Sequence, residues 1–427
     1  MREEHARDGR SLNPQPRAAD RLPRPCPSCG GFPAERLWRQ DFAIIEGVSV
    51  IDGYDIVACA TCGMTFADGI PGQAVFDRYY RNASKYEFPQ RGGAESAHDA
   101  ARLAVTADAI ASLVTDRTAR ILDVGCATGR LLAELRTRGF TELRGIDPSP
   151  VCVATARDRF ELRADAATIA DLGIADGPFD LIVLVGVLEH LVDLDAALAA
   201  LRARLSINGA LYVEVPDVTG FADWPNAPFQ EFSVEHVNFF SPGSLASALR
   251  ARGFRVEWIE RNTRDQSRGT TVANLAGLFR NGAVDQSADP AEIESLMSVH
   301  RYVARCTGEE HTIRRRVDEI VASQEPLLVW GTGTHALRLL ATSALATANI
   351  VAFVDSNARY HQRRLCGRTI IAPATLATRE EAILIVSHGL EEEIRRQIGT
   401  AGGQPRRVLS LKSCITKPVV SIKMTPL

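Results

Sequence analysis

The sequence predicts an α/β protein built on a doubly wound parallel sheet. Residues 120–149 follow the order strand, glycine turn, helix, strand, and the run Phe179–Val185 is continuously apolar, as a parallel strand buried on both faces requires. A similar alternation begins again at Leu327. A chain of 427 residues is too long for one ordinary domain, so two or three are expected.

The glycine turn has the composition of a site for an adenosine-containing ligand. It carries Asp123, Gly125 and Gly129, with Ala127 where a third glycine often occurs. Glycine allows the backbone to approach a ligand closely. The next strand ends on Asp147, whose carboxylate can accept hydrogen bonds from both ribose hydroxyls. A turn of this kind that binds no ligand is the alternative interpretation.

The net charge and the apolar segments argue against several classes of partner. Forty-nine basic and fifty-two acidic residues leave the chain nearly neutral, which disfavours nucleic acid or an anionic membrane as the main partner. The apolar stretches are far shorter than a membrane span, and no secretory signal pattern opens the chain. We therefore expect a cytoplasmic protein that acts on a small molecule.

Two C-x-x-C-G motifs predict a metal site near the N-terminus. Two such motifs supply four thiolates, enough to close a tetrahedral shell, so we expect structural zinc without an open coordination position. The four expected ligands are Cys26, Cys29, Cys59 and Cys62. A redox dithiol is the alternative, although it would need only one pair. Between the motifs, residues 42–57 alternate as a small sheet would.

Three tyrosines follow the second motif: Tyr79, Tyr80 and Tyr86. They either pack at a domain junction or form a lid whose hydroxyls reach the substrate. The segments after them continue the α/β pattern. The expected helices are 97–114, 151–160, 195–205 and 244–252, and the expected strands are 121–122, 143–146, 162–165, 179–185, 210–215, 255–260 and 271–279.

Residues 221–242 interrupt this pattern with many aromatic residues, two internal prolines and little periodicity. A long irregular insertion inside a compact domain is usually functional, and ligands bind outside the carboxyl ends of parallel strands. Glu235 and His236 are the polar centre of the insertion and therefore candidates for catalysis or substrate contact. A structural Glu-His pair is the alternative.

A charged helical segment, 289–323, leads to a second α/β unit. Its strand 327–330 precedes a G-x-G-x-x-A turn that starts at Gly331, and a further strand ends on Asp355. Such a turn is typical of Rossmann-like domains that bind a dinucleotide. A degenerate domain that binds no ligand and only shapes the substrate cleft is an equally weighted alternative. The expected units are 1–24 (disordered tail), 25–90 (zinc-binding domain), 91–284 (main α/β domain), 285–325 (helical linker) and 326–427 (Rossmann-like domain).

The turn DVGCATG resembles motif I of class I S-adenosylmethionine-dependent methyltransferases, and GIDPS resembles their second-strand acidic motif. The resemblance implies that S-adenosylmethionine is the cofactor. The cofactor-binding positions it implies are Asp123, Gly125, Cys126, Ala127, Gly129, Asp147, Asp165 (for the adenine amino group) and Gly186 (beside the methionine moiety). Glu189 and His190 follow Gly186; we expect either a helix cap or, for His190, contact with the substrate.

In its order of parts the chain resembles the three-domain sugar C-methyltransferases, over about residues 25–415. The resemblance implies that the substrate is a nucleotide-linked keto sugar. It also implies that a Tyr-x-Glu-His segment supplies acid–base residues; Glu235 and His236 match it, but Ser233 stands at the tyrosine position. His236 is then the base that forms an enolate, and Ser233 or one of the three tyrosines stabilises the enolate oxygen. O- or N-methylation and a non-catalytic binding subunit are the alternatives.

Overall fold

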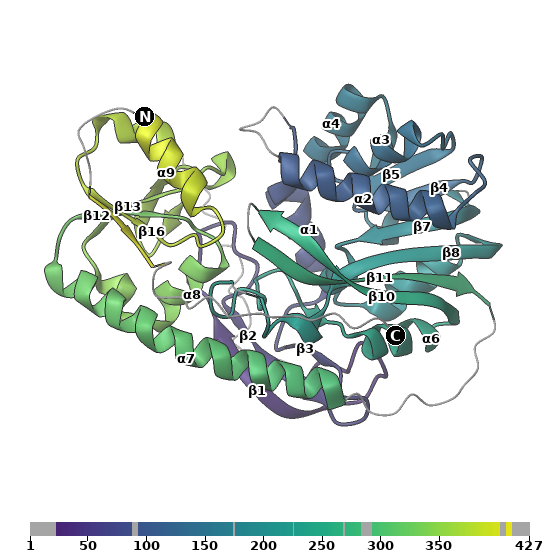
Figure 1. Cartoon of the computed structure of the whole chain (residues 1–427), viewed down its shortest axis with the longest axis horizontal. Helices are drawn as coiled ribbons and strands as arrows, with labels where there is room; N and C mark the ends of the chain where they lie inside the picture. Colours follow the sequence, from purple (N-terminus) through teal and green to yellow (C-terminus); the bar gives the residue numbers. More distant parts are fainter. Residues whose placement is uncertain are drawn as a thin grey trace, which may run out of the picture.

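The computed structural model of the chain describes residues 23–87, 93–173, 176–224, 226–267, 270–282, 293–401 and 407–411. Three sheets organise these residues into two α/β lobes and a smaller N-terminal module. Figure 1 shows the lobes on the left and right, with the long helix α7 (Ile293–Ser323) running beneath them. The expected α/β class is confirmed. No helix within the described ranges has the length and apolar character needed to cross a membrane.

The right-hand lobe contains a seven-stranded sheet in the order β10-β11-β8-β7-β4-β5-β6. Its strands are β4 (Ile121–Val124), β5 (Leu143–Asp147), β6 (Arg163–Ala166), β7 (Phe179–Val185), β8 (Leu205–Pro216), β10 (Phe254–Ser267) and β11 (Thr270–Asn281). Its helices are α2 (Ala97–Leu113), α3 (Arg130–Thr137), α4 (Pro150–Phe160), α5 (Leu194–Arg202) and α6 (Pro242–Arg250). Strands β4 to β8 are parallel, so their carboxyl ends meet at one edge.

The N-terminal module is a four-stranded antiparallel sheet in the order β1-β2-β3-β9, followed by helix α1 (Gln73–Ala83). Its strands are β1 (Pro33–Asp41), β2 (Gly53–Cys59), β3 (Thr65–Asp68) and β9 (Asn238–Phe239). The small sheet expected within 42–57 is found only in part: residues 53–57 belong to β2, and the residues before them connect β1 to β2. Its apolar side chains, such as Phe42 and Ile45, are buried against the C-terminal lobe, and Ala43 N–H donates to Leu337 O at 2.9 Å.

Arg24 corrects the expected limit of a disordered tail at residue 24. Its guanidinium donates to the carbonyl oxygens of Val237 (3.0 Å) and Val192 (2.8 Å) and to Asn238 Oδ1 (2.9 Å). Arg24 therefore joins the N-terminal module to the main lobe. The rest of the expected tail, up to residue 22, lies outside the described residues.

The left-hand lobe has a six-stranded sheet in the order β14-β15-β13-β12-β16-β17, parallel except for β14. Its strands are β12 (Leu327–Trp330), β13 (Ile350–Val354), β14 (Arg364–Leu365), β15 (Arg368–Ile371), β16 (Ala382–Ile385) and β17 (Val408–Ser410), and its helices are α8 (Thr334–Thr342) and α9 (Glu391–Thr400). The short 3-10 helices of the chain are η2 (Lys85–Glu87), η4 (Ile169–Asp171), η6 (Leu188–His190), η7 (Val218–Gly220), η8 (Ala344–Thr347), η9 (Ala358–Tyr360) and η10 (Pro373–Thr378).

The aromatic insertion, residues 221–242, packs between the N-terminal sheet and α7. Trp38 of β1 stacks on Phe229 with ring centroids 4.1 Å apart, and Phe232 meets Tyr302 of α7 at 5.1 Å. Phe229, Phe232 and Tyr302 are fully buried. Their apolar contacts hold a segment that has little regular secondary structure of its own.

A buried ion pair joins α7 to the C-terminal lobe. Arg338 of α8 is 2 % exposed; it donates to Glu310 Oε1 of α7 at 2.7 Å and lies 4.6 Å from the ring centre of Phe229. Removing one partner of a buried pair leaves a charge in a low-dielectric environment without compensation.

We expect Glu310→Leu to lower the free energy of unfolding of the C-terminal lobe by about 3 kcal/mol, because Arg338 then stays buried without a carboxylate. The double variant Glu310→Leu/Arg338→Met should recover most of this loss, since no buried charge remains. Urea unfolding followed by tryptophan fluorescence would measure both. Equal midpoints for the wild type and Glu310→Leu would contradict the assigned role of the pair.

Candidate functional site

A cavity of about 920 Å³ lies at the carboxyl ends of β4, β5 and β7. Its wall contains residues of the turn after β4, helix α1, the aromatic insertion and the first turn of the C-terminal lobe. Sequence-predicted site residues that line it are Asp123, Gly125, Cys126, Ala127, Asp147, Gly186, Tyr79, Tyr80, Tyr86, His190, Ser233, Glu235 and His236.

The turn after β4 bends through three left-handed residues: Gly125 (φ +74°), Ala127 (φ +46°) and Gly129 (φ +84°). Ala127 adopts this conformation at a cost of about 1 kcal/mol, and its N–H donates to Asp147 Oδ2 at 3.0 Å. Gly129 does not line the cavity, and its expected contact with the cofactor stays a prediction. A Cβ there would lie 2.8 Å from Ala156 Cβ, so this glycine is needed for the packing of α3 against α4.

Two buried carboxyl groups face the cavity beneath this turn. Burial and the nearby charge of Asp147 raise the pKa of Asp123 to about 8. Burial raises the pKa of Asp147 to about 6, although the N–H groups of Ser149 and Ala127 lower it. Asp147 Oδ1 accepts from Ser149 N–H at 2.8 Å, so the turn and the following helix fix its orientation.

Asp165 does not line the cavity, so its expected contact with the adenine stays a prediction. Both carboxylate oxygens are occupied elsewhere: Oδ2 accepts from Arg144 (2.9 Å) and Oδ1 from Arg157 (3.2 Å). The side chain belongs to a partly exposed ion-pair network. The chain that continues beyond β6, residues 167–170, lines the cavity in its place.

The polar groups of the insertion meet tyrosines from α1. Tyr79 O–H donates to Glu235 Oε1 at 2.9 Å, and Tyr80 Oη lies 2.9 Å from His190 Nδ1. The rings of His190 and His236 are 4.9 Å apart and nearly perpendicular. Tyr79 therefore contacts the acid–base candidate Glu235 directly, and Tyr80 contacts His190, which lies beside His236; their separation in the sequence did not reveal these contacts.

Two contacts of His190 Nδ1 bear on its tautomer. Nδ1 lies 3.0 Å from the carbonyl oxygen of Glu235 and 2.9 Å from Tyr80 Oη; the carbonyl oxygen can only accept, so a proton on Nδ1 satisfies that contact and leaves the lone pair on Nε2. Nε2 lies 3.9 Å from Glu189 Oε1. The donor atoms of Glu189, His190 and His236 are within 4.8 Å of one another, so this group could hold a proton or a divalent cation. The helix cap considered for Glu189 and His190 is wrong: Asp193 caps α5.

Ser233 shapes the turn that presents Glu235 and His236. Its hydroxyl accepts from both of their backbone N–H groups, at 3.3 Å and 3.2 Å, and its carbonyl accepts from Tyr54 O–H at 2.7 Å. The hydroxyl hydrogen itself is not used in these bonds, so it could still donate to a substrate.

The four cysteines of the two N-terminal motifs converge. Cys26 Sγ lies 3.6 Å from Cys62 Sγ, and Cys29 Sγ lies 3.5 Å from Cys59 Sγ. Zinc–sulfur bonds of about 2.3 Å in a tetrahedron place sulfurs about 3.8 Å apart, which these distances fit. None of the four cysteines lines the cavity.

The turn of the C-terminal lobe repeats the arrangement of the first turn. Thr332 N–H donates to Asp355 Oδ2 at 3.0 Å, as Ala127 N–H does to Asp147, and Asn357 N–H donates to Asp355 Oδ1 at 2.8 Å. Thr332, Gly333 and Thr334 line the same cavity as the first turn. The two lobes thus present similar turns to one space.

Glu87 connects the lobes, and sequence patterns did not single it out. It is buried, its Oε1 accepts from Ser149 Oγ at 2.7 Å, and its Oε2 accepts from Arg359 Nε at 2.5 Å. Ser149 follows the strand that carries Asp147, whereas Arg359 belongs to the C-terminal lobe. No periodicity marks such a residue, because its partners come from distant segments.

Comparison with known proteins bears on both lobes. Residues 97–258 match the family model of a methyltransferase domain, and residues 323–409 match a family model described as C2185-like, N-terminal. The chain is 25 % identical to the C-methyltransferase NovU of Streptomyces niveus over 245 residues, which are 54 % of this chain and 56 % of that protein. It is 28 % identical to a ubiquinone biosynthesis O-methyltransferase of Rhodopseudomonas palustris over 161 residues, 36 % of this chain and 54 % of that one.

A match of 39 % identity to an uncharacterized Synechococcus protein covers 24 % of this chain and 27 % of that protein. The chain thus spans between about a quarter and little more than half of these relatives. Among solved structures, a 1,6-didemethyltoxoflavin-N1-methyltransferase of Burkholderia thailandensis is 19 % identical, with a TM-score of 0.39, covering 52 % of this chain and 96 % of that one. The family match confirms that residues 97–258 carry a methyltransferase domain, as the sequence predicts.

Proposed function

We propose that the protein is an S-adenosylmethionine-dependent methyltransferase that methylates a carbon atom of a nucleotide-linked keto sugar. The observation that carries the proposal is the convergence in one cavity of the turn after β4, the Glu235–His236 segment and the turn of the C-terminal lobe. The match to NovU, a C-methyltransferase, supports carbon as the acceptor. The order of the parts supports the three-domain sugar C-methyltransferase family.

Residues of the first turn fit the cofactor. Asp147 is oriented to accept from ribose hydroxyls, and Asp123 offers a buried carboxyl group for the ammonium of the methionine moiety. Gly125 has no Cβ, and a Cβ there would collide with Val187 at 2.9 Å. The bound cofactor supplies an electrophilic methyl group, so the protein itself has to generate a nucleophile.

The insertion supplies the groups for that step. A carbon beside a ketone becomes nucleophilic when a base removes its α-proton, and His236 is the proposed base. His190, with a lone pair on Nε2, lies beside it and could relay the proton. The enolate oxygen needs a hydrogen-bond donor, for which Ser233 and Tyr80 are the candidates within the cavity wall.

The C-terminal lobe is the proposed site of the nucleotide. The N-terminus of α8 opens at Gly333, without a side-chain cap, on the shared cavity. Free N–H groups and the helix dipole at such an end favour a phosphate. The four-cysteine cluster is the proposed zinc site, with a structural role because it lies away from this cavity.

Labelled S-adenosylmethionine and a panel of nucleotide-linked 4-keto sugars test the function. We expect methyl transfer to carbon, read by mass and NMR, and exchange of the α-proton in D2O without cofactor. His236→Asn should lower turnover at least about a hundredfold and leave the affinity for S-adenosylhomocysteine within about twofold, because it removes the base and not the cofactor site.

The exposed His311 provides a matched control, since His311→Asn should keep full turnover. Transfer to oxygen without α-proton exchange would establish the O-methyltransferase alternative. Loss of cofactor binding in His236→Asn would indicate a structural histidine.

Metal analysis tests the cysteine cluster. We expect about one equivalent of zinc per chain in the wild type and less than about a fifth of that amount in Cys26→Ser. The melting temperature of Cys26→Ser should also be lower, because the metal contributes directly to folding. Cys366→Ser, at an exposed free cysteine, should change neither quantity. A second equivalent that disappears in His236→Asn would place another ion at Glu189, His190 and His236.

Cofactor binding should depend on pH through Asp123. An ammonium group needs the ionised carboxylate, but the raised pKa of about 8 keeps Asp123 largely protonated below pH 7. The affinity for S-adenosylhomocysteine should therefore fall about twentyfold from pH 8.5 to pH 6.5. Calorimetry would measure this change, and Asp123→Asn should bind more weakly but lose most of the dependence. Equal affinities at the two pH values in the wild type would refute the role of Asp123.

A further inference from the structure

We infer that Glu87 and Arg359 are positioning residues that couple the two turns of the cavity, so that a ligand at one turn strengthens binding at the other. This coupling rests on the proposed function, which assigns the cofactor to the turn after β4 and the nucleotide to the turn of the C-terminal lobe. Neither residue lines the cavity, so both act through residues that do. A continuous series of hydrogen bonds runs through them from one turn to the other.

The main lobe supplies the first half of this series. In the turn after β4, Ala127 N–H donates to Asp147 Oδ2 at 3.0 Å, and Asp147 Oδ1 accepts from Ser149 N–H at 2.8 Å. The hydroxyl of Ser149 donates in turn to Glu87 Oε1 at 2.7 Å. Ser149 and Glu87 are both buried, so their hydrogen bond forms in a low-dielectric environment. The orientation of Asp147 therefore depends on the position of Ser149, which Glu87 holds.

The C-terminal lobe supplies the second half. Thr332 N–H, in the wall of the cavity, donates to Asp355 Oδ2 at 3.0 Å, and Asp355 Oδ1 accepts from Asn357 N–H at 2.8 Å. At the start of η9, Asn357 Oδ1 accepts from Arg359 N–H at 3.1 Å. The guanidinium of Arg359 donates to Glu87 Oε2 at 2.5 Å and so completes the series.

The series crosses from one lobe to the other at the contact between Arg359 and Glu87. Within the part of the chain that the structure describes, Glu87 is the only carboxylate that pairs with Arg359. Arg359 also donates to the carbonyl oxygen of Asn82, at the end of α1. A buried carboxylate that loses its cation is left without compensation. Glu87 therefore keeps its orientation only while Arg359 stays in place.

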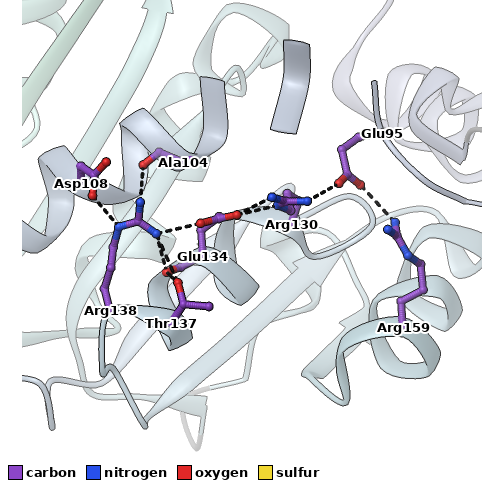
Figure 2. A network of polar contacts seen from close by, with 8 residues as sticks. All are labelled: Glu95, Ala104, Asp108, Arg130, Glu134, Thr137, Arg138 and Arg159. Atoms are coloured by element: carbon purple, nitrogen blue, oxygen red, sulfur yellow. Dashed lines mark hydrogen bonds and ion pairs between the residues drawn. The ribbon is translucent and has the colours of Figure 1, made fainter. Parts of the chain in front are cut away.

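Ion pairs make the main-lobe end of the series rigid. Figure 2 shows Glu95, just before α2, between two arginines: Oε1 accepts from Arg130 of α3 at 2.9 Å, and Oε2 accepts from Arg159 of α4 at 3.1 Å. Helix α3 follows the turn after β4, and helix α4 follows Ser149. Because Glu95 joins the two helices, a displacement of Ser149 is transmitted to that turn and is not absorbed between the helices.

The expected coupling is positive. Each ligand has to order the turn that it contacts, and this ordering costs conformational entropy. Because hydrogen bonds connect the turns, a ligand at one turn also holds the residues of the other, and the second ligand meets a site that is already ordered. Thermodynamic linkage requires the two ligands to strengthen each other by the same factor.

Calorimetry with S-adenosylhomocysteine and three nucleoside diphosphates (UDP, dTDP and GDP) tests the coupling. In the wild type, the nucleoside diphosphate that binds should increase the affinity for S-adenosylhomocysteine about tenfold, and the reverse titration should give the same factor. In Arg359→Gln and Glu87→Gln this factor should fall to about one, because the contact between the lobes is lost. Arg359→Lys should restore part of the factor. Arg359→Gln should bind S-adenosylhomocysteine alone within about twofold of the wild type, since Arg359 does not line the cavity.

Glu325→Gln is the matched control. It breaks a different ion pair of the C-terminal lobe, with Arg407 at 2.8 Å, and it should keep the full factor. Because Glu87 is buried, its replacement also lowers stability; Arg359 is partly exposed, so Arg359→Gln provides the decisive comparison.

An unchanged factor in Arg359→Gln, even with a lower melting temperature, would show that the pair is only structural and overturn the inference. A wild type that binds both ligands independently would also overturn it, while leaving the proposed function intact. Binding of S-adenosylhomocysteine without binding of any nucleoside diphosphate would instead refute the nucleotide site of the proposed function, and the coupling with it.

Discussion

The positions of Glu235 and His236, the proposed acid–base residues, depend on the aromatic packing of residues 221–242. The segment contains little regular structure, so its ordering has to be offset by contacts with its surroundings. Phe229 and Phe232 supply these contacts, and Gln40 Nε2 of β1 donates to the carbonyl oxygen of Phe232 at 3.0 Å. With its aromatic side buried, the segment turns Glu235 and His236 towards the cavity. Three separate parts of the chain thus specify the position of one histidine.

The two lobes present turns of the same local geometry to the same cavity. In each, an aspartate at the end of the second strand accepts an N–H from the turn after the first strand and another from two residues further along. The aspartates, Asp147 and Asp355, thereby fix the shape of their turns. The lobes differ in what surrounds these turns: a second buried carboxyl group, Asp123, accompanies only the first.

Sequence patterns predicted the elements whose own residues determine them. The apolar run Phe179–Val185 is the observed β7, and Ser241 with Pro242 begins α6. The alternation in 42–57 marks a strand only in its second part, β2; the apolar residues before it, such as Phe42 and Ile45, are buried against another lobe. The glycine turn and the four cysteines were predicted because their spacing is local.

The contacts that complete the site join residues that are far apart in the sequence, so local sequence patterns do not predict them. Asp165 matches a family position, but the arginines that occupy it come from other elements, and its sequence neighbours do not indicate them. Glu87 and Arg359 acquire their surroundings only when distant strands and helices assemble. Tyr79 and Tyr80 were assigned to a junction or a lid, and their bonds to Glu235 and His190 combine both interpretations.

Strand β9, only two residues long, has consequences for any attempt to shorten the chain. It joins the end of the aromatic insertion to β3, with Phe239 opposite Thr65 and Asn238 opposite Phe66. Deleting everything before α2 would leave the insertion without its neighbouring strand and expose the apolar face on which it rests. We therefore expect that the stretch that resembles a methyltransferase does not fold autonomously, and fusions or domain exchanges should keep the first strands and the insertion from the same parent.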